Sequence, residues 1–315
     1  MKLRRVGIIG VGHVGAHVAY SLLIQGIADE LVLIGRTEKK VIAEVQDLRD
    51  AVAYAPNRCK VNAGTFDDLK DCDVVVHTAG NVSILKGTTD RLTEMRYTVP
   101  MLRECAAKIK ASGFNGILIN ITNPCDVVTK LMAETLGLPK GHVFGTGTGM
   151  DTSRLLSTLS KHTDIDHKSI DAYMLGEHGN KQFCPWSCVT FHGVPLSKME
   201  QTDEKFRFDH DELQKETIGG GWVTYAGKEC TEYGIATTAA KMVSVIFRDE
   251  KVILPVSAPL DGEYGEKDLY AGVPCVIGKD GVEKVVELPL NEEEAKQFHE
   301  CCEGIRENLE HAKDM

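Results

Sequence analysis

Three short segments carry polar residues of the kinds that transfer protons and bind anions. They are Thr122-Asn123-Pro124, Asp151-Thr152-Ser153-Arg154 and Gly176-Glu177-His178-Gly179-Asn180. A histidine titrates near neutral pH and can deliver a proton, and an arginine can hold a carboxylate through two parallel hydrogen bonds. Taken alone, His178 is more typical of a turn, and Asp151 of a helix cap that pairs with Arg154. Proton chemistry is indicated only where the fold brings the segments together.

A glycine-rich loop near the N-terminus has the pattern of a dinucleotide-binding site. This loop follows an apolar run, opens a helical stretch, and reads Gly10-Val11-Gly12-His13-Val14-Gly15. Gly10 permits a tight turn, Gly12 lets the backbone approach a pyrophosphate, and Gly15 permits close packing of the helix on the strand. His13 and Val14 lie at the helix N-terminus, whose amides attract phosphate. We therefore expect a dinucleotide cofactor here.

The end of the second predicted strand is the place expected for the adenosine ribose, and it reads Ile34-Gly35-Arg36-Thr37. An acidic residue there would bind the ribose hydroxyls and repel a 2′-phosphate. Gly35 does neither, and Arg36 can pair with that phosphate for about 1.5–3 kcal/mol. The alternative is that Arg36 is a solvated surface residue. Both NAD(H) and NADP(H) stay open, with NADP(H) slightly favoured.

The first half of the chain alternates unbroken apolar runs with helical stretches, the first of which covers residues 13–25. The predicted strands cover residues 6–9, 31–34, 74–76 and 117–121. Such strands are buried on both faces, and helices between them indicate a doubly wound parallel sheet. Asn123 then follows a strand at the carboxyl edge of the sheet, where these folds bind ligands.

The second half has antiparallel features. Predicted strands cover residues 169–175, 188–194, 275–278 and 282–286. Lys279-Asp280-Gly281, between the last two, is typical of a hairpin turn. Asn291 can cap a final helix, whose apolar stripe is expected to pack on the body of the chain. The predicted fold class is α/β, with a dinucleotide-binding domain at 1–145 and an α+β substrate domain at 146–315.

Composition excludes several function classes. The 315 residues carry 36 Lys+Arg and 46 Asp+Glu, for a formal net charge of -10. Nucleic-acid binding is not expected because phosphate neutralisation needs a basic face, and no apolar run is long enough for a membrane span. The ten scattered cysteines indicate reduced, buried thiols in a cytoplasmic protein. Cys184 and Cys188 are not expected to bind a metal, and no metal site is predicted.

The ordered motifs resemble the L-lactate/L-malate dehydrogenase superfamily over nearly the whole chain, and most of all its L-2-hydroxyisocaproate dehydrogenase branch. The matching segments are the glycine loop, the three polar segments above, Pro185-Trp186-Ser187 and Thr231-Glu232-Tyr233-Gly234-Ile235. The resemblance implies a Rossmann domain, an α+β substrate domain with antiparallel strands, and a homotetramer or homodimer. It also implies an NAD(P)-dependent oxidoreductase that transfers a hydride between the cofactor and a 2-hydroxy or 2-oxo acid.

The resemblance also implies roles for single residues. His178 is the acid–base group, Asp151 orients its ring and favours the imidazolium, and Arg91 lies on a loop that closes over the substrate and polarises its carbonyl. The other matches are residues that bind substrate or cofactor: Arg154 for the substrate carboxylate, Asn123 for the carbonyl and the cofactor, Thr231 for the substrate pocket and Ile235 for the nicotinamide.

The loop before Arg91 departs from the family pattern. At the position six residues before Arg91, lactate enzymes resemble one another in having a glutamine, and malate enzymes in having an arginine. This chain has Leu85 there. A leucine offers no partner for a second carboxylate, so an apolar side chain such as that of 2-oxoisocaproate is expected, with pyruvate reacting slowly. In a shifted register, Ile84 or Lys86 would face the substrate, and Lys86 would restore dicarboxylate specificity.

Two further alternatives stay open: lactate or malate specificity proper, and a catalytically silent cofactor sensor. Activation by fructose 1,6-bisphosphate is not expected. The family's activated members resemble one another in an arginine and a histidine at two positions that are Leu156 and Asp171 here. Asp171 would repel a phosphate.

Overall fold

The computed structural model describes residues 3–80, 91–179 and 181–315. Its strands are β1 Arg5–Ile9, β2 Glu30–Ile34, β3 Lys60–Ala63, β4 Val74–His77, β5 Ile117–Asn120, β6 Val143–Gly145, β7 Ile170–Asp171, β8 Thr190–Phe191, β9 Val194–Pro195, β10 Val252–Asp261, β11 Lys267–Gly278 and β12 Gly281–Val285. Its α-helices are α1 His13–Ile24, α2 Glu38–Val52, α3 Arg91–Ala111, α4 Cys125–Leu136, α5 Gly149–Thr163, α6 Leu196–Thr202, α7 His210–Lys228, α8 Tyr233–Arg248 and α9 Glu292–Lys313.

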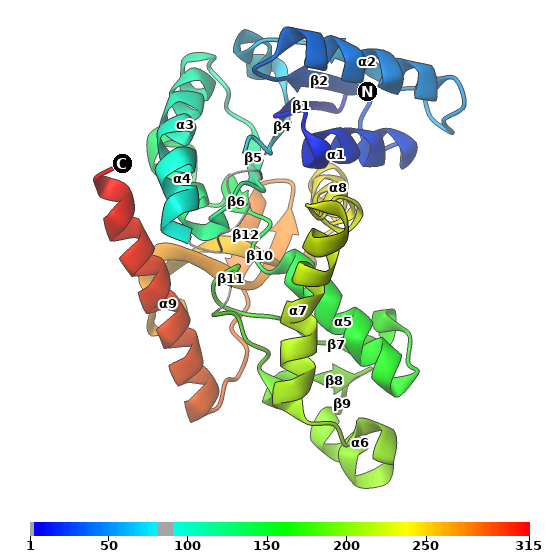
Figure 1. Ribbon diagram of the computed structural model, residues 1–315, viewed down its shortest axis with the longest axis vertical. Coiled ribbons are helices and arrows are strands. Elements are labelled where there is room, and N and C mark those ends of the chain that lie inside the picture. The colour runs from blue at the N-terminus through cyan, green and yellow to red at the C-terminus, as the bar shows by residue number, and fades with distance from the viewer. Residues whose placement is uncertain (1–2, 81–90, 180) are drawn as a thin grey trace.

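One large sheet runs through the molecule in the order β12-β11-β10-β6-β5-β4-β1-β2-β3. The six strands of the first half are parallel, and four of them, β1, β2, β4 and β5, coincide with the apolar runs that predict a parallel sheet; β3 and β6 were not predicted. Helices cover both faces, so the predicted doubly wound fold is confirmed (Figure 1). The antiparallel strands β10–β12 extend this sheet, and the junction is the pairing of Ser257 with Gly145.

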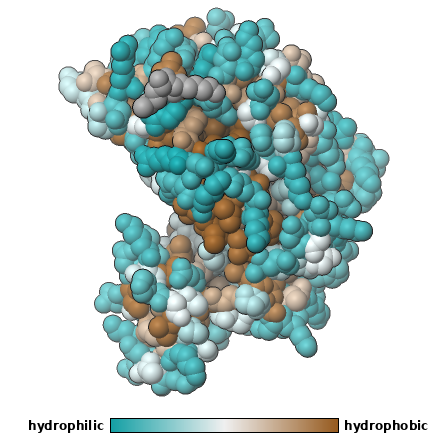
Figure 2. Space-filling view, turned by 180° about the vertical axis from the view of Figure 1, so that it is seen from behind, coloured by the Kyte–Doolittle hydropathy of each residue, from teal (hydrophilic) through white to brown (hydrophobic). Residues whose placement is uncertain are grey.

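The core lies between the sheet and its helices. Every residue of β2 is buried, and α1 turns Val18, Leu22 and Leu23 inward against the sheet and α8. The largest apolar cluster contains side chains from both halves of the chain, from Val6 to Ile305. Apolar residues also gather at the middle of the surface seen from behind, beside a hollow between the upper and lower parts (Figure 2).

Two of the predicted strands are wrong in extent. Instead of 169–175, only β7 forms, because Met174 donates its N–H to Thr152 Oγ1 at 2.9 Å and Leu175 pairs only with Phe183. Instead of 188–194, the chain forms a turn and the two-residue strands β8 and β9. These strands make a separate three-stranded antiparallel sheet with β7.

The C-terminal elements follow their sequence signals. Residues 278–281 join β11 to β12 as the predicted hairpin. Asn291 caps α9 by accepting a hydrogen bond from the Glu294 amide at 2.9 Å. The buried stripe of α9, which includes Phe298, Cys302 and Ile305, packs on the body of the chain as predicted. Among the described residues, no helix has the length and apolar character needed to cross a membrane.

Candidate active site

The glycine loop has the geometry of a phosphate cradle. Gly10 has a φ of +97°, and a Cβ at Gly15 would lie 1.8 Å from the Gly10 carbonyl oxygen, so both positions require glycine for the fold itself. A Cβ at Gly12 would meet no atom within 4 Å. Because the fold does not demand a glycine at this position, the bare backbone there fits the approach of a pyrophosphate to the N-terminus of α1.

Substitution of these glycines separates the demands of the fold from those of the cofactor. Gly15→Ala is expected to lower the free energy of unfolding by about 1–3 kcal/mol through overpacking. Gly12→Ala is expected to leave that free energy unchanged and to weaken cofactor binding by about tenfold or more, about 1.4 kcal/mol. Thermal melts and fluorescence titration with NADH and NADPH measure the two effects. Equal cofactor affinity of Gly12→Ala and the unmodified protein would contradict the assignment.

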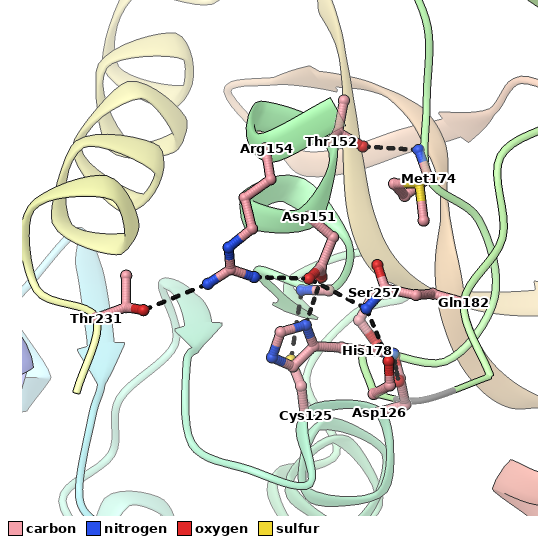
Figure 3. A network of polar contacts seen from close by, with 12 residues as sticks. Cys125, Asp126, Asp151, Thr152, Arg154, Met174, His178, Gln182, Thr231 and Ser257 are labelled. Carbon is pink, nitrogen blue, oxygen red and sulfur yellow. Dashed lines mark hydrogen bonds and ion pairs between the residues drawn. The ribbon is translucent and has the colours of Figure 1, made fainter. Parts of the chain in front are cut away.

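The catalytic candidates meet on one buried carboxylate. The Nδ1 atom of His178 lies 2.5 Å from Asp151 Oδ2, and Arg154 donates to Asp151 Oδ1 at 2.9 Å (Figure 3). Asp151 and Arg154 lie three residues apart on α5, so they share one helix face. The side chain of Asp151 is only 3% exposed, whereas those of His178 and Arg154 are 23% and 17% exposed. His178 and Arg154 are therefore partly exposed to solvent, while the carboxylate that both contact is buried.

Electrostatics favour an ionised Asp151. Burial raises the pKa of this carboxyl. The charge and hydrogen bond of His178 and the charge of Arg154 together outweigh that rise, so the pKa lies below its usual value. Gln182 adds a hydrogen bond to Oδ1 at 3.2 Å. The negative charge in turn orients the ring of His178 and favours its protonated form. This geometry leaves Nε2 as the ring nitrogen that does not contact Asp151.

A cavity of about 280 Å³ joins these groups to the glycine loop. Its wall includes His178, Arg154 and Asn123, together with Val14 and Ile235 from the cofactor side. The Asn123 side-chain oxygen is buried and has no hydrogen-bond partner in the described part of the chain. An unpaired buried amide oxygen is costly, so it fits a donor on a bound molecule. The groups on the glycine-loop side of the cavity thus fit a nicotinamide dinucleotide, and those around Arg154 fit an anionic substrate beside it.

Other predicted site residues have different surroundings. Thr231 accepts a hydrogen bond from Arg154 at 3.3 Å and lines the cavity. Arg36 is exposed at the end of β2, with a 3.4 Å contact to the hydroxyl of Tyr97. A Cβ at Gly35 would lie 2.9 Å from Val41 and 3.0 Å from Val11, which explains the glycine by packing alone.

Two predicted residues cannot be placed. Leu85 lies outside the described residues, and so does the side chain of Arg91, the first residue of α3. Glu94, one turn further along α3, lines the cavity, so this end of the helix borders the site. Asn180 of the histidine segment also lies outside the described residues.

The exposed side chain of His13 contacts Glu232 at 2.7 Å, and with Cys230 these residues bring three possible metal ligands within 4.8 Å of one another. Lys228 already pairs with Glu232. The N-termini of α1 and α8 meet here as well, and their dipoles disfavour a cation. These contacts tie the glycine loop to α8 and leave the cluster poorly suited to a metal.

Comparison with known proteins decides the family. Residues 4–145 match the family model of the lactate/malate dehydrogenase NAD binding domain, and residues 148–315 match that of the lactate/malate dehydrogenase alpha/beta C-terminal domain. The chain belongs to the lactate/malate dehydrogenase family. The match of the first half supports the nicotinamide cofactor that the glycine loop predicts.

Members of the lactate/malate dehydrogenase family are similar over the full length. The chain is 41% identical to the L-lactate dehydrogenase of Fusobacterium nucleatum over 99% of this chain and 98% of that protein, and 40% identical to L-lactate dehydrogenase 3 of Bacillus cereus over 97% of each. The structure of MGS-M5, a lactate dehydrogenase enzyme from a Medee basin deep-sea metagenome library, superposes with a TM-score of 0.95 at 33% identity, covering 99% of this chain and 100% of that one. The ligands-bound minor L-lactate dehydrogenase of Enterococcus mundtii gives a TM-score of 0.93 at 33% identity, covering 98% of each chain.

Sequence analysis missed some residues of this lactate/malate dehydrogenase site. Gln182 contacts Asp151 across 31 residues of chain, and Gly221, Trp222 and Tyr225 of α7 line the cavity. The only available signal was the run Gly219-Gly220-Gly221 inside a helix, because glycine weakens a helix and often marks close packing.

Proposed function

We propose that this chain is an NAD(P)-dependent L-2-hydroxy acid dehydrogenase that acts on acids with an apolar side chain, such as 2-hydroxyisocaproate, and more slowly on lactate. The observation that carries the proposal is the contact of His178 and Arg154 with one buried carboxylate at the wall of a cavity that reaches the glycine loop. Residues 1–145 would then bind the dinucleotide, and residues 146–315 the substrate.

The residues divide the reaction among them. When bound, the nicotinamide supplies a hydride to the carbonyl carbon of a 2-oxo acid. Arg154 has five N–H donors, of which one bonds Asp151 and one bonds Thr231, so three remain for the substrate carboxylate. The substrate oxygen takes the proton from His178 Nε2, and Asp151 stabilises the imidazolium before the transfer. The proposed role of Arg91 is to polarise the carbonyl, and that of Leu85 is to contact the side chain.

The described wall of the cavity supports an apolar substrate side chain. Ile218, Trp222 and Tyr225 line it from α7, and Gly221 leaves space beside Arg154, because a Cβ there would lie 3.4 Å from the guanidinium carbon. This arrangement supports 2-oxoisocaproate or phenylpyruvate over oxaloacetate.

A substrate panel tests the proposal. Loss of absorbance at 340 nm is followed with NADH and NADPH against 2-oxoisocaproate, phenylpyruvate, pyruvate and oxaloacetate. We expect the highest kcat/KM with the first two, slower turnover of pyruvate and the slowest of oxaloacetate. Turnover of oxaloacetate alone would contradict the assignment of the Leu85 loop. Cofactor binding without turnover of any acid would identify a sensor instead of an enzyme.

The choice between NADH and NADPH is tested at Arg36. A side chain at Gly35 would collide with Val11 and Val41, so a substitution there would disturb the packing as well as the cofactor site. Pairing of Arg36 with a 2′-phosphate predicts that Arg36→Ala lowers kcat/KM for NADPH by about 10- to 150-fold, the equivalent of about 1.5–3 kcal/mol, and leaves NADH turnover within about twofold. Arg58→Ala is the control, since the pairing of Glu30 with Lys60 places Arg58 near the opposite edge of the sheet. Equal losses with both cofactors would show that Arg36 does not read the phosphate.

Fructose 1,6-bisphosphate is not expected to activate the enzyme. Leu156 packs within an apolar cluster, and the exposed carboxylate of Asp171 accepts a hydrogen bond from Thr190 at 3.2 Å. Neither offers a cation to a phosphate. Initial rates with and without millimolar sugar phosphate should agree, and a clear rise would overturn this expectation. The predicted homotetramer or homodimer is a separate question for size-exclusion chromatography with light scattering.

A further inference from the structure

Behind the catalytic histidine lies a second buried carboxylate. Asp126 is in the first turn of α4 and is 2% exposed. Its Oδ2 atom accepts the backbone N–H of His178 at 2.9 Å, and its Oδ1 atom accepts the hydroxyl of Ser257 at 2.6 Å. One carboxylate therefore joins α4, the His178 loop and β10 (Figure 3). Asp151 holds the ring of this histidine, whereas Asp126 holds its backbone.

The charge on this side chain is not explained by packing. Asparagine has almost the same shape and volume and could accept one of the two hydrogen bonds through its carbonyl oxygen. Burying a carboxylate is costly unless a cation lies near. No lysine or arginine forms an ion pair with Asp126 in the described part of the chain, whereas the positive charge of His178 acts on it and lowers its pKa.

We propose that Asp126 is a positioning residue for proton transfer, which fixes the backbone of His178 and whose negative charge supports the protonated form of the imidazole ring. This inference rests on the proposed function, in which His178 gives its proton to the substrate. The two buried carboxylates then flank the histidine, and each acts on a different part of it.

The surroundings of Asp126 make the two protonation steps interdependent. Burial raises the pKa of Asp126 to about 6, and the hydrogen bonds from Ser257 and His178 and the charge of His178 oppose that rise. Among the described groups, the carboxylate of Glu177 also acts on the pKa of Asp126, and the charge of Asp126 in turn raises the pKa values of the neighbouring thiols of Cys125, Cys301 and Cys302. Because coupling between two sites is reciprocal, loss of charge at Asp126 must make protonation of His178 less favourable.

The experiment compares Asp126→Asn with Ser257→Ala, which removes one hydrogen bond from the same carboxylate but leaves the carboxylate in place. Imidazole NMR signals are followed from pH 5 to 9, and the His178 signal is identified by its loss in His178→Gln. We expect Asp126→Asn to lower the titration midpoint of His178 by about one pH unit, and Ser257→Ala to lower it clearly less because the ionisable carboxyl group remains. An unchanged midpoint in Asp126→Asn overturns the proposal.

Kinetics give a second readout. With the best 2-oxo acid of the panel, Asp126→Asn should lose about tenfold in kcat/KM at pH 8 and much less at pH 6, where Asp126 itself takes up a proton in the unmodified protein. A loss of equal size at every pH indicates a structural role only and contradicts the proposal. If no acid is turned over, the proposed function fails, but the NMR titration still decides the coupling.

A third measurement does not depend on the folding of Asp126→Asn. Carboxyl NMR signals of Asp126 in the unmodified protein and in His178→Gln report the reciprocal effect. Removal of the imidazolium is expected to raise the pH at which Asp126 takes up a proton. An identical titration in both proteins shows that the groups are uncoupled and overturns the proposal.

Discussion

Replacement of His178 by glutamine is expected to lower kcat/KM for the best 2-oxo acid by about 10²–10⁴-fold, the usual contribution of a positioned acid–base group. Glutamine keeps an amide near the site but cannot deliver a proton. The backbone N–H that bonds Asp126 stays in place, so the loop should be retained. NADH fluorescence titration should give an unchanged dissociation constant, since the ring acts on the substrate.

His167→Gln is the matched control, because His167 is an exposed histidine of the same half of the chain. It should behave as the unmodified protein does in both assays. Turnover by His178→Gln within about threefold of the unmodified rate would require another proton donor, since that contribution is at least about 10²-fold. A parallel loss of cofactor affinity would point to damage at the cavity instead of loss of the acid.

Arg154→Lys is expected to lower kcat/KM by about 10- to 150-fold, the equivalent of about 1.5–3 kcal/mol for hydrogen bonds to a charged group. Lysine preserves the positive charge near Asp151 but not the planar fork that matches a carboxylate. The effect should appear chiefly in KM for the 2-oxo acid, because the interaction is present both in the ground state and in the transition state.

Oxamate, a small carboxylate without a reducible ketone, separates binding from turnover in this variant. Its inhibition constant should rise with KM in Arg154→Lys and stay unchanged in the control Arg207→Lys, an exposed arginine that bonds the carbonyl of Glu200. If oxamate binds Arg154→Lys as tightly as it binds the unmodified protein, another residue holds the carboxylate.

The fold was predictable where sequence periodicity and topology agree. The four strands predicted between Val6 and Ile121 are apolar runs, and their parallel order follows from the helices between them. The central strand β10 was not predicted, because Pro255 and Pro259 disfavour an interior strand. The strand predicted at 188–194 was wrong because apolar content alone does not show where the chain turns, and His192 and Gly193 both have positive φ there.

The candidate site was predictable where a short motif carries the chemistry. The sequence singled out His178, Asp151 and Arg154, and the structure brings them together. It did not indicate Asp126, which reads as an acidic residue in the first turn of a helix, with no sign of a contact 52 residues away. Long-range contacts of this kind follow from the tertiary packing of loops and cannot be read from local spacing.

The junction between Gly145 of β6 and Ser257 of β10 has a consequence for how the chain folds. The sheet crosses it without a break, and one apolar cluster lies on both sides. A fragment truncated after Gly145 would expose the hydrogen-bonding edge of β6 and an uncovered apolar surface, and such edges recruit other chains into aggregates. We therefore expect the two proposed binding segments to fold together as one unit.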